Sequence, residues 1–301
     1  MRQERNAIAL LITIMFVIVI TVAIGYGLKQ VNEASKIVKN ENFMYQSHII
    51  VEDVLNILQT SQEVKMIADD NSTSELFLFL SQSAFIPFES SGLEIIMKIS
   101  SARAKFNPLL LKANLVRQDV MKQYLNNYMI NNQYVDLLLD NISGIKEDNR
   151  YYSSIFDENP YLFRDYIASS KHLEKINNFY TKEFNDNALS KVDFNNLFYY
   201  SDDNNTKIDL NYATTEVWEM LLGTSKERAE FLSNSGGSYT EESPPDLTSD
   251  EKESLNYFNA TNYFEPILFV EVEISKDDVS SNISFEYNIK ERKGSNFVYE
   301  L

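Results

Sequence analysis

An uncharged run near the amino terminus restricts this chain more than any other feature of its sequence. Between Ala7 and Leu28 lie 22 residues, AIALLITIMFVIVITVAIGYGL, none of which is charged. As a helix that rises about 1.5 Å per residue, such a run is roughly 33 Å long and crosses one bilayer. No Gly or Pro occurs between Leu28 and Ile86, so nothing in the sequence ends the helix where the membrane ends. We therefore predict a leader, a membrane-spanning half and a water-exposed half of one helix, at 1–7, 8–28 and 29–68.

The charges beside this run indicate its direction across the membrane. Arg2 and Arg5 precede it with Glu4 as the single opposing charge, which favours a cytoplasmic amino terminus and a body on the other side. Three lysines between residues 29 and 39 act against that orientation. Two other interpretations stay open. Residues 23–25 resemble the cleavage site of a secretory signal, although the run exceeds the usual core of about 7 to 15 residues, and a simple membrane anchor has the same composition.

The charge balance and the absence of cysteine exclude several classes of function. The chain has 44 Asp and Glu residues against 27 Lys and Arg residues, which gives a formal charge of −17 at pH 7. A surface this acidic repels phosphate groups, so we expect no nucleic-acid partner. Without cysteine there are no disulfides, no thiolate nucleophiles and no zinc sites built on cysteine.

Beyond the membrane run, the pattern of apolar residues changes from a helix period to a strand period. Val51, Val54, Leu55 and Leu58 share one side of a helix, and DDNST at 69–73 ends it. Alternating residues predict a strand at 93–99. They also predict an antiparallel meander with one polar face, at 268–274, 283–289 and 297–301. We therefore predict an α+β fold in which a long amino-terminal helix packs on an antiparallel sheet.

The middle of the chain has a different character. Between 114 and 205 apolar residues recur at helical spacing, with one Gly and one Pro in the whole stretch. We predict a mostly helical insertion domain there, with one helix around 163–176. It separates two parts of an α/β domain, which we place at 69–113 and 206–301.

Residues 207–232 predict two short helices around the break Leu222-Gly223-Thr224-Ser225. Asn211 is a candidate cap for the first helix, with Thr214 and Thr215 as competitors. In nucleic-acid binders, a turn between two such helices offers N–H groups to phosphate. Four glutamates surround this turn, so we interpret the pair as a structural hairpin.

Four stretches give the chain a resemblance to a known family. They are RNAIALLITIM near its start, LEIIMKISSARAKFNPLLL from residue 93, KIDLNYATTEV from residue 207 and ATNYFEPILFVEVEI from residue 260. Together they resemble type IV pilin-like proteins, and among these the K-type minor pseudopilins of type II secretion systems. Pro108 departs from the family's turn motif. The residues that match the family's motifs are Phe106, Asn107, Ile208, Asn211, Ala213, Tyr263 and Phe264.

The resemblance implies that a prepilin peptidase removes the leader. Aligning the apolar run with the family's places Ala7 before the cut and Ile8 at the new terminus, with a cut between Asn6 and Ala7 as the alternative. Such leaders normally end in Gly, and no Gly precedes this run. Most pilins also carry Glu at the fifth mature position, where it compensates the buried amino terminus of the subunit ahead. That position is Ile12 here, which fits a subunit with nothing ahead of it, at the tip of a filament.

We find no catalytic motif in the sequence. Only His48 and His172 are present, and no phosphate loop, nucleophile elbow or metalloprotease motif occurs, so we predict no enzyme. The resemblance implies that calcium binds the soluble domain. The candidate ligands are Asp202, Asp203 and Asp209, although their spacing is not that of a calcium-binding loop. We predict no other cofactor.

These features lead to one main hypothesis and two competitors. The chain is predicted to be a minor pseudopilin at the tip of a type II secretion pseudopilus, where it starts assembly for protein export across the outer membrane. Its expected partners are other minor pseudopilins, the major pseudopilin, the inner-membrane assembly platform and the prepilin peptidase. Its expected place is the bacterial inner membrane, crossed once, with the body in the periplasm. A minor pilin of a type IV pilus or DNA-uptake machine shares these features. A membrane-anchored periplasmic sensor or binding module is the competitor from another class.

Overall fold

The computed structural model describes residues 29–30, 41–70, 72–90, 92–112, 114–261, 265–276 and 279–300. The chain divides into two compact units, 1–54 and 55–301. Within the described residues, no helix is both long and apolar enough to cross a membrane. The leader and the predicted membrane-spanning half at 8–28 lie outside the described residues, and they stay predictions.

In the first unit, residues 29–30 and 41–54 are helical. Val51 is 2% exposed and Val54 is completely buried, as the predicted apolar stripe requires. His48 lies on the exposed side and faces Glu52 one turn later, with 3.6 Å between Nε2 and Oε1. The helical spacing of apolar residues thus places buried side chains on one side of this segment and exposed side chains on the other.

The second unit begins with the last turns of this helix, which ends at Thr60. The structure differs here from the predicted unbroken helix to residue 68, because Ser61 lies outside the helical conformation. Its Oγ accepts a hydrogen bond from Val64 N at 3.2 Å. A serine in that role caps a new helix. Two helices follow, α2 (Gln62–Asp70) and α3 (Thr73–Ser83).

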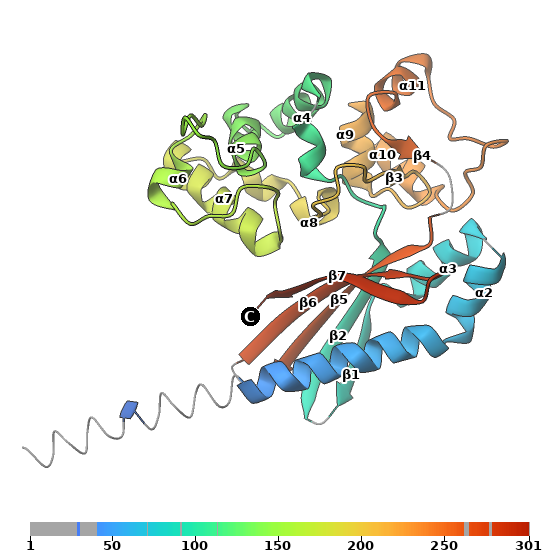
Figure 1. The fold of residues 1–301 in the computed structure, drawn as a ribbon. Coiled ribbons are helices and arrows are strands. Elements are labelled where there is room, and N and C mark those ends of the chain that lie inside the picture. The colour runs from blue at the N-terminus through green and yellow to red at the C-terminus, as the bar shows by residue number, and fades with distance from the viewer. Residues whose placement is uncertain are drawn as a thin grey trace, which may run out of the picture. The chain divides into compact units, whose positions relative to one another are not determined.

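Five strands form an antiparallel sheet in the order β1-β2-β5-β6-β7 (Figure 1). They are β1 (Ile86–Ser90), β2 (Leu93–Ser101), β5 (Ile267–Lys276), β6 (Val279–Asn288) and β7 (Lys293–Glu300). The predicted strand at 93–99 and the predicted meander are confirmed. The last strand starts earlier than predicted, because Lys293, Gly294 and Ser295 already pair with β6.

The two faces of the sheet have opposite character. On the apolar face, alternate residues of the central strands are at most 5% exposed; they are Ile95, Met97, Ile99, Leu268, Val270, Val272, Ile274, Ile283, Phe285 and Tyr287. The end of the first helix packs there. A Cβ at Gly294 would lie 2.9 Å from Leu55 Cδ2, and Gln59 Nε2 donates a hydrogen bond to Arg292 O at 3.2 Å. The other face, here called the polar face, carries Lys98, Glu271 and Ser284 in one cross-strand row.

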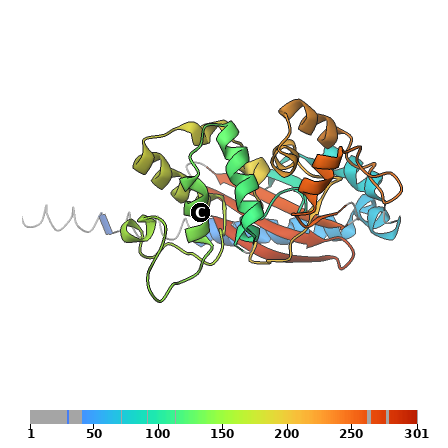
Figure 2. The same cartoon turned by 90° about the horizontal axis from the view of Figure 1, so that it is seen from above.

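The chain between β2 and β5 forms a helical part that lies over the polar face (Figures 1 and 2). Its longer helices are α4 (Leu115–Asn127), α5 (Gln133–Asn141), α7 (Ser170–Phe184), α9 (Thr215–Leu222), α10 (Lys226–Asn234) and α11 (Ser249–Leu255). Its short elements are η1 (Pro108–Leu111), α6 (Ile155–Glu158), η2 (Ala188–Lys191), α8 (Phe194–Leu197), β3 (Ile208–Asp209) and β4 (Ala260–Thr261).

One hydrophobic core holds this helical part together from Phe106 to Phe258. The helical part is therefore larger than the predicted insertion at 114–205. Trp218 on α9 is completely buried in the same core as Tyr134 on α5. Burial of large aromatic side chains in one cluster joins α9, α10 and α11 to the earlier helices. The α+β class predicted from the sequence is confirmed.

Helix ends depend on hydrogen bonds that the apolar pattern does not show. Thr214, and not Asn211, caps α9, because its Oγ1 accepts from Val217 N at 3.3 Å. The predicted helix around 163–176 begins only at Ser170, since Ser169 Oγ accepts from His172 N at 3.2 Å. A capping side chain sets the residue at which the helix begins.

Candidate functional site

The family-motif residues described by the structure gather where the sheet meets the helical part. Phe106 is completely buried, and its backbone pairs with the last residue of α8 and with a residue just after that helix. Phe106 N donates to Leu197 O, and Tyr199 N donates to Phe106 O, both at 2.9 Å. Asn107 Nδ2 donates to Ser201 O at 3.1 Å and to Asp203 O at 3.0 Å. This pair thus fastens the segment that follows β2 to residues 197–203 of the helical part.

The second motif, from Ile208 to Ala213, ties three segments together. Ile208 N donates to Asn259 O at 2.8 Å and so joins β3 to β4. Asn211 exchanges two hydrogen bonds with the Tyr239 backbone, at 3.1 Å from Nδ2 and 2.9 Å to Oδ1. Ala213 is 2% exposed. Gly236 leaves room for the motif, since a Cβ there would collide with Asn211 O. The motif therefore acts in the structure as an internal brace.

Arg103 connects this brace to the polar face of the sheet. Its carbonyl oxygen accepts from Asp209 N at 2.9 Å. Its Nε lies 3.0 Å from Glu265 Oε2, and its Nη1 lies 3.8 Å from Glu286 Oε1. The Arg103 side chain is 11% exposed, so these contacts are partly shielded from water.

Asp209 is the most perturbed carboxyl group of the brace. It is completely buried, its Oδ1 accepts from Asn211 N at 2.9 Å, and its Oδ2 has no hydrogen-bond partner in the described part of the chain. Burial raises the pKa of Asp209 to about 7, against hydrogen bonds from Asn211 and from the Glu265 backbone that lower it.

The structure does not bring the three predicted calcium ligands into one site. Asp202 and Asp203 are exposed, whereas Asp209 is buried. In the described ranges, no group of three or more acidic or histidine side chains is placed to hold a metal ion. These residues therefore do not fit the predicted site, and calcium binding itself stays a prediction. Calorimetry on the full chain tests calcium binding. If adding calcium produced no heat and no rise in Tm, the prediction would be refuted.

Several predicted positions fall outside the described residues. They are the cleavage residues Ala7 and Ile8, the tip-type position Ile12, and the motif pair Tyr263 and Phe264.

The two histidines have ordinary structural surroundings. His172 is 7% exposed, and its Nδ1 accepts a hydrogen bond from Ala168 N at 3.2 Å. Burial lowers the pKa of His172 to about 4, so its ring is neutral at pH 7. His48 lies on the exposed side of the first helix. That no enzyme activity resides here stays a prediction.

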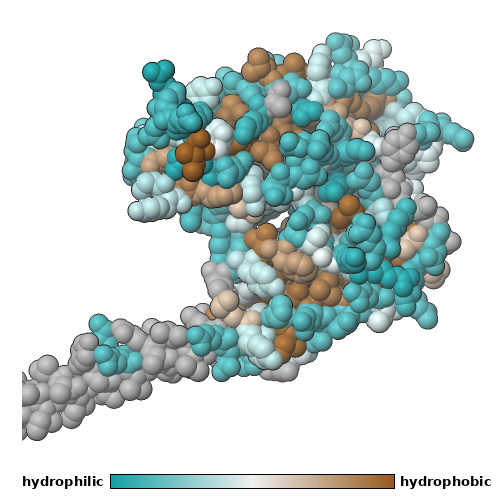
Figure 3. All heavy atoms as spheres, viewed as in Figure 1, coloured by the Kyte–Doolittle hydropathy of each residue, from teal (hydrophilic) through white to brown (hydrophobic). Residues whose placement is uncertain are grey.

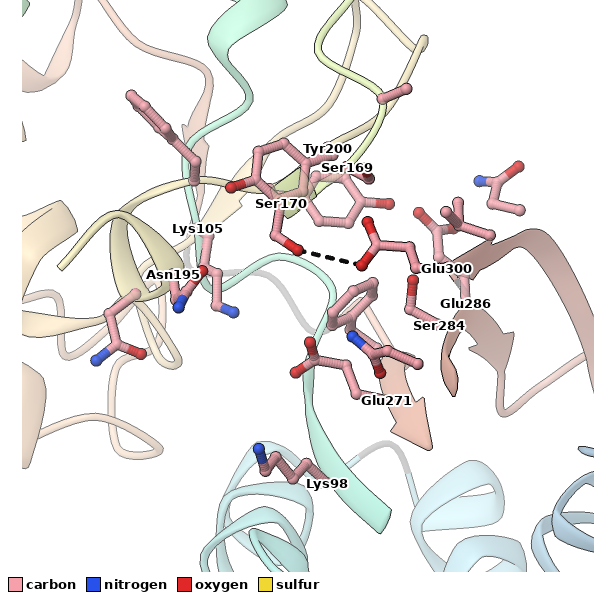
Figure 4. A pocket seen from close by; sticks show the side chains of 18 residues that line it. Lys98, Lys105, Ser169, Ser170, Asn195, Tyr200, Glu271, Ser284, Glu286 and Glu300 are labelled. Atoms are coloured by element: carbon pink, nitrogen blue, oxygen red, sulfur yellow. Dashed lines mark hydrogen bonds between the residues drawn. The ribbon is translucent and has the colours of Figure 1, made fainter. Parts of the chain in front are cut away.

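A cleft of about 360 Å³ lies between the polar face and the helical part (Figure 3). Its lining comes from β2, β5, β6 and β7, from Lys105 in the segment after β2, and from residues within two further stretches of the helical part, 168–170 and 195–200. Figure 4 shows Ser170 pointing to Glu300, at 3.4 Å between Oγ and Oε2. Sequence reasoning missed this cleft. Lys105, Tyr200 and Glu300 meet there although they lie far apart in the chain, and no local pattern links them.

Burial alters the acid–base properties of two side chains in this cleft. It lowers the pKa of Lys105, which Glu271, Asp193 and Glu216 act to raise. It also raises the pKa of Tyr200, and Glu300 and Glu271 add to that shift. The cleft therefore offers polar groups in surroundings poorer in water than the open surface.

Comparison with known proteins finds similarity to solved structures. No protein-family model and no curated protein matches the chain. A chain in the crystal structure of the GspK-GspI-GspJ complex from the enterotoxigenic Escherichia coli type 2 secretion system is similar to it. The similarity covers 87% of this chain and 97% of that chain, at 11% sequence identity and a TM-score of 0.46. The function has to be inferred from the residues of this chain themselves.

Proposed function

We propose that this chain is a minor pseudopilin at the tip of a type II secretion pseudopilus, where it starts the assembly of a filament for protein export. It sits in the bacterial inner membrane with its body in the periplasm. Its partners are the other minor pseudopilins, the major pseudopilin, the assembly platform and the prepilin peptidase.

The observation that carries the proposal is the attachment of the amino-terminal helix to the sheet. Leu55 and Gln59 near its end pack on or beside the apolar face, and an uncharged run long enough for one bilayer precedes it in sequence. A helix that packs on an antiparallel sheet, with an apolar run before it in the sequence, is the arrangement in which this chain resembles type IV pilin-like proteins.

The tip position is supported by what the apolar run lacks. Ile12 stands where a glutamate would compensate the amino terminus of a subunit ahead, and the first acidic residue after the run is Glu33. An unpaired carboxylate in lipid is costly. A subunit at the tip has no subunit ahead and no need of that charge.

The amino terminus of the mature protein gives the sharpest test. Mass spectrometry of the chain from its own cells should find a cut before Ile8 or Ala7 with a methylated terminal amine. Cells without the prepilin peptidase are the control and should contain the uncut chain. An uncut terminus in normal cells would favour a membrane-anchored sensor or binding module instead.

A deletion separates secretion from the pilus alternative. Removing the chain should abolish filament assembly and the export of secreted proteins, and a plasmid copy should restore both. Loss of surface pili or of DNA uptake with normal secretion would assign the chain to a type IV pilus or DNA-uptake machine.

A further inference from the structure

The cleft between the polar face and the helical part contains two polar groups that the described residues leave without a hydrogen-bond or ion-pair partner. Lys105 Nζ lies 5.6 Å from the centre of the Phe269 ring and makes no hydrogen bond or ion pair within the described ranges. The hydroxyl group of Tyr200 is buried and has no hydrogen-bond partner there either. Groups of this kind cost folding free energy unless something binds to them.

The carboxylates of the cleft are already engaged elsewhere. Glu300 accepts from Ser170 Oγ and from Lys171 N, each at 3.4 Å. Glu286 lies 3.8 Å from Arg103, and Glu271 stands opposite Lys98 in the strand register. None of the three reaches Lys105 within ion-pair distance in the described part of the chain. Among the described residues, Lys105 therefore has no anionic partner, and an anionic group of a bound ligand would supply one.

Amide side chains around the cleft match the chemistry of a peptide backbone. Asn195, Asn282 and Asn296 line it, and their side chains make no hydrogen bonds to the described residues. Each carries both a donor and an acceptor, as a peptide group does. The volume of about 360 Å³ lies within the common range of ligand pockets, about 300–1,000 Å³.

We propose that this cleft binds an extended peptide segment of a partner protein, and that Lys105 and Tyr200 receive a carboxylate group of that peptide. The carboxylate comes from an acidic side chain or from a free carboxy terminus. A phosphate group fits less well, because Glu271, Glu286 and Glu300 line the same cleft and repel a double negative charge.

The test uses the full chain in detergent micelles and a phage-displayed library of random peptides in two formats, one with free carboxy termini and one with internal segments. Enriched peptides are synthesised, and their binding is measured by fluorescence polarisation. We expect them to share one carboxylate. Replacing it by the amide should weaken binding about tenfold or more, as for the loss of a charge-assisted hydrogen bond. The format that yields binders identifies the source of the carboxylate.

Variants of the chain assign the binding to the cleft. Lys105→Met and Tyr200→Phe should each weaken binding, and Lys105→Met should leave Tm unchanged or higher, because it removes a buried ammonium group that lacks a partner. Lys252→Met, an exposed lysine on α11, is the matched control and should bind normally. Tyr200→Phe removes only a hydroxyl group, so it keeps the test valid if Lys105→Met fails to fold.

Three results would overturn the proposal. The first is a library that yields no binder. The second is a set of peptides that Lys105→Met and Tyr200→Phe bind as tightly as the original chain. The third is that succinate, used alone as a probe, binds in the cleft as tightly as the peptides do. The cleft would then be a site for small carboxylic acids.

Discussion

The two faces of the five-stranded sheet differ in how they contact the rest of the chain. The apolar face buries alternate residues of β2, β5 and β6 and receives Leu55 from the first helix. The polar face meets the helical part through hydrogen bonds, ion pairs and a cleft. Area removed from water stabilises the first face, whereas the second depends on whether individual polar groups find partners.

This difference separates stability from recognition. An apolar contact tolerates small changes in geometry, but a buried polar group without its partner is costly. The polar face is therefore where the chain has room for specific binding and where single hydrogen bonds have large effects. Four substitutions test this contrast.

The largest effect is expected on the apolar face. Phe285 is completely buried and stacks on Phe297 with 5.1 Å between ring centres. Phe285→Ala should lower the free energy of unfolding by about 3–5 kcal/mol, because it opens a cavity in the core. Urea denaturation measures it. Ser284→Ala, next in sequence but on the polar face, should change stability by about 0.5 kcal/mol or less. Equal losses in the two variants would contradict the contrast.

The junction beside the polar face comes next. Asn107 is 2% exposed, and its Nδ2 satisfies the carbonyl oxygens of Ser201 and Asp203. Asn107→Ala should cost about 2–3 kcal/mol, since it leaves the buried carbonyl group of Ser201 without this donor and removes the partly buried bond to Asp203 O. Asn204→Ala changes an exposed asparagine of the same loop and serves as the control. A loss no larger than that of the control would show that water replaces the side chain.

Asp209 should make the stability of the internal brace sensitive to pH. The pKa of Asp209 is raised to about 7 in the folded chain and is near 3.8 in the unfolded chain. The contribution of this carboxyl group to the free energy of unfolding is therefore smallest above pH 7. Stability contributed by its protonated form is fully present below about pH 4 and is lost as pH rises through 7. Asp209→Asn should therefore stabilise the chain by about 1–3 kcal/mol at pH 8 and by much less at pH 4.

Urea denaturation at both pH values measures this difference, with the exposed Asp202→Asn as the matched control. A gain that is the same at both pH values would refute the assigned pKa.

The smallest effect is expected at the cap of α9. Thr214 Oγ1 accepts from Val217 N at 3.3 Å and donates to Asn196 O at 2.7 Å. Thr214→Ala should cost about 1 kcal/mol, and Thr214→Ser should restore most of it. Thr215→Ala at the neighbouring position separates the two threonine candidates, and a larger loss of stability there would assign the cap to Thr215. Thermal unfolding resolves such differences.

Local patterns were enough to predict much of the fold. Alternation along 268–274 and 283–289 predicts both the strands and their polar side, because successive side chains point to opposite faces. The break at Gly223 is equally local, since a residue with φ of 58° at a helix end favours glycine. The interruption at Ser61 was missed, because serine is tolerated within helices and its capping role depends on the turn that follows.

The apolar run, the strand periods and the acidic charge balance can be read from the amino-acid sequence, because they depend only on which residues are present and on their neighbours. The burial of Asp209, the common core of α5 and α9, and the meeting of Lys105 with Tyr200 in one cleft became visible in the folded chain. Those properties depend on which distant segments come together, and that is set by packing of the whole chain.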